Sequence, residues 1–290
     1  MKVFVSSNDA GGAEALADYL SVKKIDFDCY LTGPALNIFR RKFHKLNEVE
    51  LHDIRNYSEV LVSTSATSMT EFNVLKIAKS HDIRCTSIID SGGNISMRYS
   101  RQDLCILPDL IIVHSVQISE EIKKTLSSCP QIIIDESYYM ANIRLLSEHI
   151  MPDCCLYLAE PVSEHALQYF GDENYFGFNE YEALNGFLMN LSRINSKIKQ
   201  VIIRVHPDEN FTKYLECINA FKLTNSNNLQ INFSSNVDLK SDLESVCEVY
   251  GCSNNAMYIA HLSGLKVTSV LPENVTQYGI YSDFFNVYRY

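Results

Sequence analysis

The chain has 290 residues, of which 46% are hydrophobic and 21% are charged, a composition typical of a globular protein with a core large enough for two domains. Its formal net charge of -10 argues against broad binding of duplex nucleic acid, which needs a basic face. No apolar run approaches the roughly 20 residues of a membrane span, and the start of the chain turns polar too soon for a signal peptide. We therefore expect a cytoplasmic protein that binds no nucleic acid.

The first half of the chain shows the alternation of strands and helices that is typical of an α/β domain. A β-rich run at 2–7 leads into a loop with Gly11 and Gly12, and a helical pattern follows at 13–20. Further strands are expected at 27–31, 59–63, 84–90, 110–114 and 131–135, and helices at 36–45, 70–80 and 119–128. This alternation predicts a parallel sheet with right-handed crossovers. The two glycines do not complete the Gly-x-Gly-x-x-Gly pattern of dinucleotide-binding proteins.

A second half of the same kind begins near Pro152. Strands are expected at 154–158, 201–205, 230–233, 249–252 and 266–270, and helices at 181–193, 211–221, 238–247 and 255–262. The sequence therefore predicts an α/β protein of the GT-B type, in which two Rossmann-type parallel-sheet domains face each other across a cleft. We place the first domain at 1–150 and the second at 151–290.

The chain contains nine cysteines, none of which forms a Cys-x-x-Cys pair. An odd count without metal-ligand spacing argues against a structural metal site. Most of the cysteines lie in apolar stretches, where a reduced cysteine packs as a small hydrophobic side chain. Cys154 and Cys155, for example, belong to a strand that the pattern predicts to be buried. We expect neither a catalytic nor a metal-binding cysteine.

The stretch 201–210 contains the clearest candidates for chemistry. Its apolar strand brings Arg204 and His206 to the start of a loop, and Pro207 ends the strand. The carboxyl ends of strands line the ligand crevice of an open α/β sheet. There, Arg204 can form a bidentate contact with a phosphate and His206 can donate a hydrogen bond to one. Glu209 either binds a ribose hydroxyl or caps the following helix, and the His-Pro pair is alternatively an ordinary turn.

A second loop places small polar residues between a strand and a helix, in the order Gly251-Cys252-Ser253-Asn254-Asn255. Backbone N–H groups and the helix dipole point out of such a turn and together make a phosphate site. Ser253 or Asn254 alternatively serves as the helix N-cap, which stabilises a helix by about 1 kcal/mol. The two roles are compatible. Because the ends of neighbouring strands meet at one sheet edge, we expect this loop beside His206.

Together, the Arg-x-His-Pro loop and the later serine loop resemble the donor-binding half of bacterial GT-B glycosyltransferases that make surface polysaccharides. They are similar to the His-Pro and serine motifs of sialyltransferases and polysialyltransferases. In the first half, segments 7–14, 88–90 with 98–99, and 107–109 resemble parts of polysaccharide-locus proteins.

This resemblance implies roles for individual residues. It implies that His206 stabilises the departing phosphate and that Ser253 and Asn254 bind phosphate. It also implies that no metal or other cofactor is needed, because positive groups such as Arg204 take that place. Asn254 stands where the sialyltransferase motif has a second serine, so the motif leaves the nucleotide open.

Asp9 is the first candidate for the general base that an inverting glycosyltransferase needs. It lies in the first strand-to-helix loop beside Gly11 and Gly12, which leave room for a ligand and its phosphates. Alternatively, Asp9 caps the helix that follows. Asp90 is the second candidate, since it ends an apolar strand. If Arg98 pairs with Asp90, that carboxylate is structural rather than basic.

Three other features are weaker candidates. The basic cluster at 40–45 fits a solvated helix face, or contact with a lipid-diphosphate acceptor or the inner membrane surface. His114 ends a strand and is either a core residue or faces the cleft. Glu160 follows the strand 154–158, and we expect it near the cleft.

The sequence favours a metal-independent glycosyltransferase that moves a sugar from a nucleotide-activated donor to a glycan or lipid-linked acceptor in capsule or lipopolysaccharide synthesis. In this interpretation, the second domain binds the donor and the first lies on the acceptor side. The alternatives are a nucleotide-sugar hydrolase or 2-epimerase of the same fold, and a non-catalytic domain that binds a nucleotide-sugar.

Overall fold

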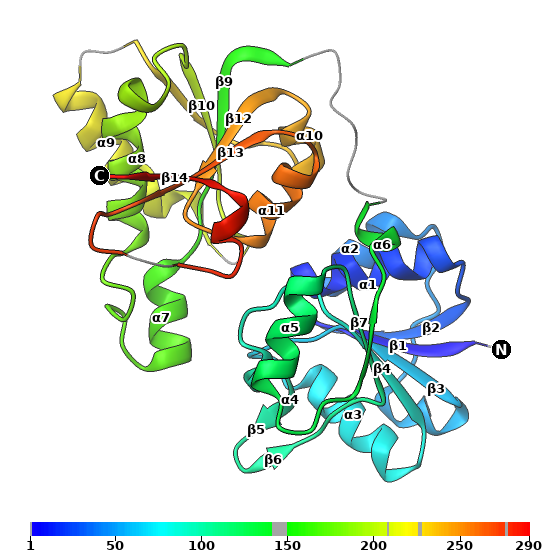
Figure 1. Ribbon diagram of the computed structural model, residues 1–290. Helices are drawn as coiled ribbons and strands as arrows, with labels where there is room; N and C mark the ends of the chain where they lie inside the picture. The colour runs from blue at the N-terminus through cyan, green and yellow to red at the C-terminus, as the bar shows by residue number, and fades with distance from the viewer. Residues whose placement is uncertain (1, 141–149, 208, 226–227, 276–277) are drawn as a thin grey trace. The chain divides into compact units, whose positions relative to one another are not determined.

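The computed structural model describes residues 2–140, 150–207, 209–225, 228–275 and 278–290. The chain divides into two compact units, Met1–Asn142 and Ile143–Tyr290, and each is built around a parallel sheet (Figure 1). The prediction of two Rossmann-type domains is therefore confirmed. The division lies eight residues before the expected boundary at 150, and residues 141–149 lie outside the described part of the chain.

Six parallel strands form the sheet of unit 1, in the order β2-β1-β3-β4-β7-β8. They are β1 (Val3–Ser7), β2 (Phe27–Leu31), β3 (Glu59–Val62), β4 (Arg84–Ile88), β7 (Leu110–Val113) and β8 (Gln131–Ile134). β1 and β7 are buried along their whole length, as expected of strands that are covered on both faces. The direction of strand order reverses between β1 and β3, and α/β proteins bind ligands at the carboxyl ends of such a pair.

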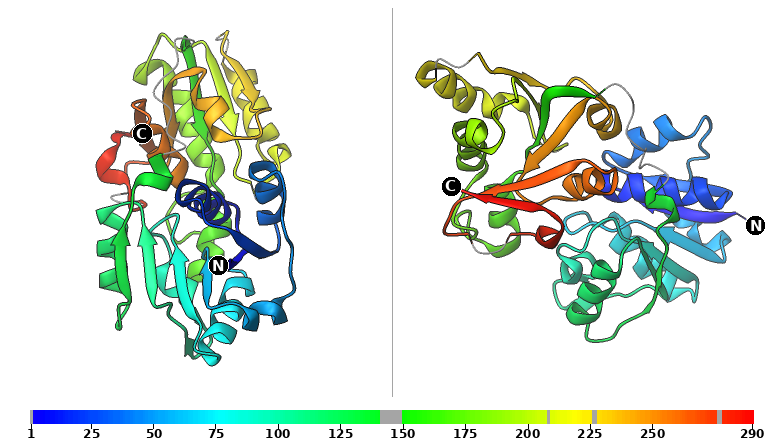
Figure 2. Two further views of the ribbon diagram at one scale, coloured as in Figure 1. Left: turned by 90° about the vertical axis from the view of Figure 1, so that its right-hand side faces the viewer. Right: turned by 45° about the horizontal axis from the view of Figure 1, so that its top comes forward.

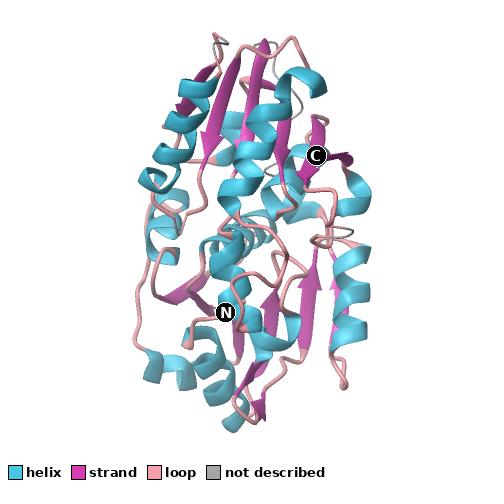
Figure 3. Ribbon diagram, turned by 90° about the vertical axis from the view of Figure 1, so that its left-hand side faces the viewer, coloured by secondary structure: helices cyan, strands magenta, loops and turns pink. Residues whose placement is uncertain are grey.

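Helices cover both faces of this sheet (Figure 3). They are α1 (Ala10–Lys23), α2 (Ala35–Lys42), η1 (Leu51–Asn56), α3 (Thr70–Ser80), α4 (Ile95–Tyr99), α5 (Val116–Thr125) and α6 (Ser137–Met140). A short antiparallel pair, β5 (Ser100–Arg101) and β6 (Leu104–Cys105), follows α4. α5 begins earlier than the expected start at 119, because Ser115 caps it by accepting the Ile118 N–H.

The sheet of unit 2 also has six parallel strands, in the order β11-β10-β9-β12-β13-β14. They are β9 (Met151–Leu158), β10 (Gln200–Arg204), β11 (Gln230–Phe233), β12 (Val246–Gly251), β13 (Lys266–Leu271) and β14 (Asn286–Arg289). Here the direction of strand order reverses between β9 and β12. The ligand crevice of a dinucleotide-binding fold with this order lies at the carboxyl ends of those two strands.

The strands of unit 2 lie between helices (Figure 2). The helices are α7 (Val162–Phe170), α8 (Glu180–Ile194), η2 (Phe211–Tyr214), α9 (Leu215–Thr224), α10 (Leu239–Leu243), α11 (Asn255–Leu262) and η3 (Ser282–Phe284). The larger core cluster packs Leu184 and Phe187 of α8 against Tyr157 of β9 and Tyr250 of β12. The Tyr157 and Phe187 rings stack at 4.8 Å. This packing buries α8 against the two strands at the switch point, beneath the loops that follow them.

The sequence did not predict three elements of unit 2, which are α7, β14 and η3, and it placed one helix wrongly. Glu164 in the first turn of α7 is nevertheless a helix-start signal. The helix expected at 238–247 ends at Leu243, and β12 begins at Val246. The β-branched valines at 246 and 249 favour a strand there, and pairing with β9 and β13 supplies the hydrogen bonds.

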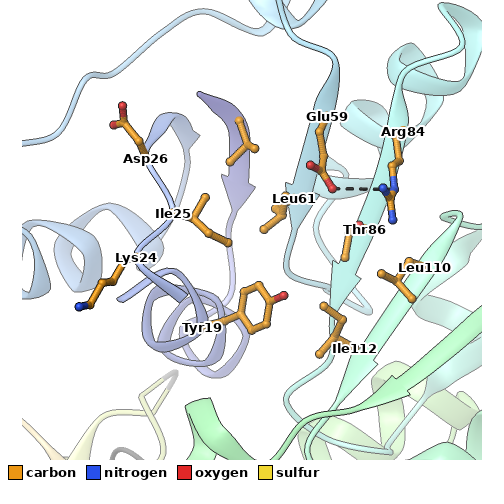
Figure 4. A pocket seen from close by; sticks show the side chains of 11 residues that line it. Tyr19, Lys24, Ile25, Asp26, Glu59, Leu61, Arg84, Thr86, Leu110 and Ile112 are labelled. Atoms are coloured by element: carbon orange, nitrogen blue, oxygen red, sulfur yellow. Dashed lines mark ion pairs between the residues drawn. The ribbon is translucent and has the colours of Figure 1, made fainter. Parts of the chain in front are cut away.

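A hollow of about 510 Å³ lies at the amino-terminal end of the sheet in unit 1 (Figure 4). Leu61 and Ile112 contribute to its apolar floor, and an ion pair between Glu59 and Arg84 at 3.9 Å stands on its rim. Ligands of open α/β sheets bind at the opposite, carboxyl ends of the strands. The hollow is therefore not the expected ligand site. Within the described ranges, no helix is both long and apolar enough to cross a membrane.

Candidate functional site

The carboxyl ends of β9, β10 and β12 bring the candidate residues of unit 2 to one edge of the sheet. Glu160 follows β9, His206 follows β10, and Ser253 follows β12. Because the three strands are hydrogen-bonded neighbours in the order β10-β9-β12, the loops after them lie side by side. The His-Pro and serine loops share this edge, with the end of β9 between them.

The half-buried His206 ring contacts a second histidine. His165, on α7, packs edge-to-face on it, with 5.5 Å between ring centroids, and Tyr169 packs on His165 at 5.5 Å. His165 was not among the expected site residues, because the sequence pattern did not predict α7. A ring N–H of an imidazole donates hydrogen bonds, so this pair can offer donors where β10 ends. That arrangement suits the stabilisation of a departing phosphate.

Arg204 is held by contacts within unit 2. Its Nη1 lies 2.7 Å from Oδ2 of Asp242, whose side chain is fully buried. Nη1 also donates to the carbonyls of Asn236 and Asp238, at 3.1 and 3.2 Å. Nη2 donates to the Val237 carbonyl at 3.1 Å. Arg204 thus ties β10 to the segment before α10. Its assignment to phosphate stays a prediction, and these contacts favour a structural role.

The loop after β12 has two distinct polar side chains. Asn254 is the N-cap of α11, and its side chain accepts the Met257 N–H at 3.0 Å, which confirms the capping interpretation for this residue. Ser253 is 8% exposed, and its Oγ has no hydrogen-bond partner among the described residues. The Ser253 N–H donates to Glu160 Oε1 at 2.9 Å. The assignment of both residues to phosphate stays a prediction.

Glu209 does not cap the next helix, because the N-cap of η2 is Asn210. Glu209 Oε1 instead accepts hydrogen bonds from Lys213 Nζ and the Tyr214 hydroxyl, both at 2.8 Å. Its Oε2 is buried and has no partner among the described residues. The capping alternative is wrong, and a contact with a ribose hydroxyl stays a prediction.

Three carboxylates surround the Lys213 ammonium. Nζ lies 2.7 Å from Glu164 and Glu180 and 2.8 Å from Glu209, and one oxygen of each carboxylate lies within 4.8 Å of the others. Burial alone would lower the pKa of Lys213, but the three carboxylates raise it above its usual value. Oxygens at this spacing can surround a Ca²⁺ ion. In this protein, the ammonium takes the position that such a cation would occupy.

We expect Lys213→Ala to create a cation site. Without the ammonium, the three carboxylates repel one another, so the variant should unfold at a lower temperature than the wild type in chelator. Millimolar Ca²⁺ should restore much of that loss, because a bound ligand stabilises the folded state, and it should leave the wild-type melting temperature unchanged. Thermal unfolding with and without Ca²⁺ measures both effects. An unchanged melting temperature of Lys213→Ala in Ca²⁺ would contradict the assignment of this cluster.

In unit 1, Asp9 follows β1 and precedes α1. Its side chain makes no capping hydrogen bond, which contradicts the capping alternative. A Cβ on Gly11 would lie 2.5 Å from Asp90 Oδ2, and one on Gly12 would lie 2.9 Å from Ser63 Cβ. The glycines therefore let α1 pack closely against these two side chains. The room expected beside them for a ligand is occupied, and their assignment to phosphate stays a prediction.

Asp90 pairs with Arg98, which is the arrangement that would make this carboxylate structural. Arg98 Nη1 lies 2.9 Å from Asp90 Oδ1 and 2.6 Å from Thr64 Oγ1, and Nη2 donates to Ser91 Oγ at 2.9 Å. The guanidinium thereby joins the loops after β3 and β4. A carboxylate held in this way is structural, so Asp9 is the better candidate for the base.

Glu71 belongs to the same edge and was missed by the sequence analysis. It is 2% exposed in the first turn of α3, and its Oε1 accepts the Asn8 N–H at 2.7 Å and the Ser63 hydroxyl at 3.0 Å. Burial raises its pKa. A glutamate is common in the first turn of a helix, so the sequence gives no sign of a special role for Glu71. The packing of α3 against β1 and β3 shows that it fixes the loop before Asp9.

The remaining candidate residues of unit 1 are held by contacts within that unit. In the basic cluster 40–45, Arg41 and Lys42 pair with Glu14 of α1, which leaves less positive charge for a lipid acceptor or a membrane surface. His114 is 3% exposed, and its ring stacks on Tyr139 at 3.7 Å. Burial lowers the pKa of His114 to about 4. These properties favour the core interpretation of His114.

Comparison with known proteins supports the fold. No protein-family model matches the sequence, and no curated protein matches it. Among solved structures, UDP-GlcNAc 2-epimerase from Methanocaldococcus jannaschii is similar with a TM-score of 0.61 at 11% identity, over 100% of this chain and 89% of that one. The enzyme from Neisseria meningitidis bound to UDP-GlcNAc gives 0.58 at 12%, over 95% and 84%. MurG from Acinetobacter baumannii gives 0.54 at 8%, over 100% and 86%. The chain therefore has a GT-B-type fold.

Proposed function

We propose that the chain is an enzyme that breaks the bond between the anomeric carbon of a sugar and the phosphate of a nucleotide. The observation that carries this proposal is the edge of unit 2 where the half-buried His206 and the N-terminus of α11 lie on two loops that flank the end of β9. His206 supplies a proton donor, and the start of α11 supplies backbone N–H groups. Both lie where negative charge develops on the phosphate as the bond breaks.

Among reactions that begin in this way, we propose glycosyl transfer to a glycan or lipid-linked acceptor, as in capsule or lipopolysaccharide synthesis. His206 stabilises the departing phosphate, Ser253 and Asn254 hold it, and Asp9 removes the acceptor proton. The likeness of the two motif loops to those of sialyltransferases supports this choice. No metal is part of the proposed reaction, since positive groups take over the charge.

A 2-epimerase is the second candidate, and the fold comparison favours it. The structures of similar fold include proteins described as UDP-GlcNAc 2-epimerases. An epimerase that breaks the same bond must also remove the proton from the second carbon of the sugar and return it on the opposite face before the sugar rejoins the nucleotide. A hydrolase is a third outcome, in which water attacks instead of an acceptor.

Incubation with nucleotide-sugars in the absence of an acceptor separates these candidates. A transferase should release free sugar only slowly, because its site excludes water until an acceptor hydroxyl binds. NMR of the mixture distinguishes this result from the appearance of a C2 epimer and from stoichiometric free sugar. Either of those products would replace transfer as the proposed reaction.

His206→Ala tests the donor site itself. We expect nucleotide affinity or turnover to fall by at least about ten-fold, equivalent to about 1.4 kcal/mol, in a protein that stays folded. His52→Ala is the matched control, because the His52 side chain is 81% exposed in η1 of unit 1. If calorimetry and rate assays do not separate His206→Ala from this control, the donor-site assignment is wrong.

A further inference from the structure

Glu160 is a buried carboxyl group at the switch point of unit 2. It follows β9 and is 8% exposed. Its Oε1 accepts the Ser253 N–H at 2.9 Å, just before α11, and the Tyr278 hydroxyl lies 3.4 Å from its Oε2. An acidic side chain therefore already contacts the loop that the proposed function assigns to phosphate. The inference below rests on that proposed function.

An ionised Glu160 beside the Ser253 loop conflicts with the binding of a phosphate by the same loop. A helix N-terminus favours one negative charge, through its dipole and its free first-turn N–H groups. A phosphate bound there would lie close to the carboxylate in a site with little water, where like charges repel strongly. A neutral carboxylic acid removes the repulsion. Its carbonyl oxygen still accepts the Ser253 N–H, so the loop keeps its shape.

Ser253 strengthens the case that a ligand completes this site. Its Oγ is buried without a partner among the described residues, and a buried hydroxyl without a partner is costly. The Oγ packs against Gly279, whose φ of +72° and missing Cβ leave just enough space for it. A phosphate oxygen at the start of α11 would give this hydroxyl an acceptor.

We propose that Glu160 takes up one proton when a phosphate binds at the α11 N-terminus, so that the site binds its nucleotide-sugar together with a proton. The proton comes from solvent and is released again when the nucleotide leaves. Glu160 acts here as a positioning residue, because it reaches the phosphate through the Ser253 loop. Affinity for the donor then falls as pH rises through the neutral range.

The surroundings of Glu160 place this titration near neutral pH. Burial raises its pKa to about 7, against the opposing hydrogen bonds from Ser253 and Tyr278, and the Glu209 charge acts in the same direction as burial. Burial also raises the pKa of Cys252 and Tyr278 well above their usual values, so neither titrates in this range.

The other titratable groups near Glu160 are paired, buried or the same in the proteins that are compared. Although burial opposes it, Lys213 lowers the pKa of Glu180, and Lys213 itself pairs with both Glu180 and Glu209. Tyr157 of β9 stays neutral, because burial raises its pKa. His165 and His206 stand on the same sheet edge, and both are unchanged in a Glu160 variant, so their contribution to binding is common to the two proteins that are compared.

The test is calorimetric binding of UDP-GlcNAc, and of another nucleotide-sugar if that one does not bind, at several pH values. These ligands carry no proton that titrates near pH 7. Wild-type affinity should weaken by about ten-fold between pH 7 and pH 8.5, as linkage to one ionising group requires. Glu160→Gln, which is neutral at every pH, should lack this ten-fold component, so its affinity should fall about ten-fold less than that of the wild type over the same range. Glu216→Gln, an exposed change on α9, should behave like the wild type.

A second measurement needs no variant and covers the case in which Glu160→Gln fails to fold. Binding to the wild type at pH 7.5, in two buffers of different ionisation enthalpy, should show uptake of more than about half a proton. Zero uptake, or the same pH profile in folded Glu160→Gln and wild type, overturns the proposal and leaves the proposed function standing. If no nucleotide-sugar binds the wild type at any pH, the proposed function and this inference both fail.

Discussion

Asp9→Asn should lower turnover by about two or more orders of magnitude while nucleotide affinity survives, the range typical of a lost general base. Asparagine keeps the size and the hydrogen-bonding capacity of the side chain but cannot take a proton. The wild-type side chain makes no capping hydrogen bond to α1, so loss of a cap cannot account for a slow variant. Steady-state rates and nucleotide binding, measured on the same preparation, separate chemistry from affinity.

Two comparisons make the Asp9 result specific. Asp26→Asn is the matched control, since Asp26 lies on the rim of the hollow at the amino-terminal end of the same sheet (Figure 4), and it should be fully active. Asp90→Asn disturbs the ion pair with Arg98 and should act mainly on stability. If Asp9→Asn is active and a folded Asp90→Asn is inactive, the roles of the two carboxylates are reversed.

Arg204→Met should lower the free energy of unfolding by about 3–5 kcal/mol, because it leaves the fully buried Asp242 carboxylate without its cation. Methionine keeps much of the side-chain volume, so lost packing contributes little. Chemical denaturation measures the change. Arg193→Met, an exposed substitution on α8, should cost less than about 0.5 kcal/mol.

A double-mutant cycle identifies the source of this loss. If Arg204 stabilises unit 2 through Asp242, then Arg204→Met combined with Asp242→Asn should cost less than the sum of the two single changes, since the pair is lost only once. A variant Arg204→Met that is as stable as the wild type but binds nucleotide poorly would instead support the phosphate-binding role predicted from sequence.

The alternation of apolar runs and amphipathic stretches was enough to predict both Rossmann-type sheets. The strand β2 (Phe27–Leu31) and the helices α3 (Thr70–Ser80) and α11 (Asn255–Leu262) were predicted to the residue, because their hydrophobic periodicity is a local property of the chain. Positions at strand ends follow from the same patterns. Asp9, His206 and Ser253 could therefore be assigned to carboxyl edges before the sheet order was known.

The partners of those residues depended on tertiary structure. Arg204 and Asp242 are 38 residues apart, and nothing local shows that one neutralises the other. The same holds for Glu160 and Ser253, which are 93 residues apart, and for Glu71 beneath the loop before Asp9. A sequence pattern records which face of an element is apolar, because that property repeats along the chain. Whether a charged side chain at a strand end meets solvent, a ligand or a buried opposite charge is decided by elements that fold against it from elsewhere in the chain.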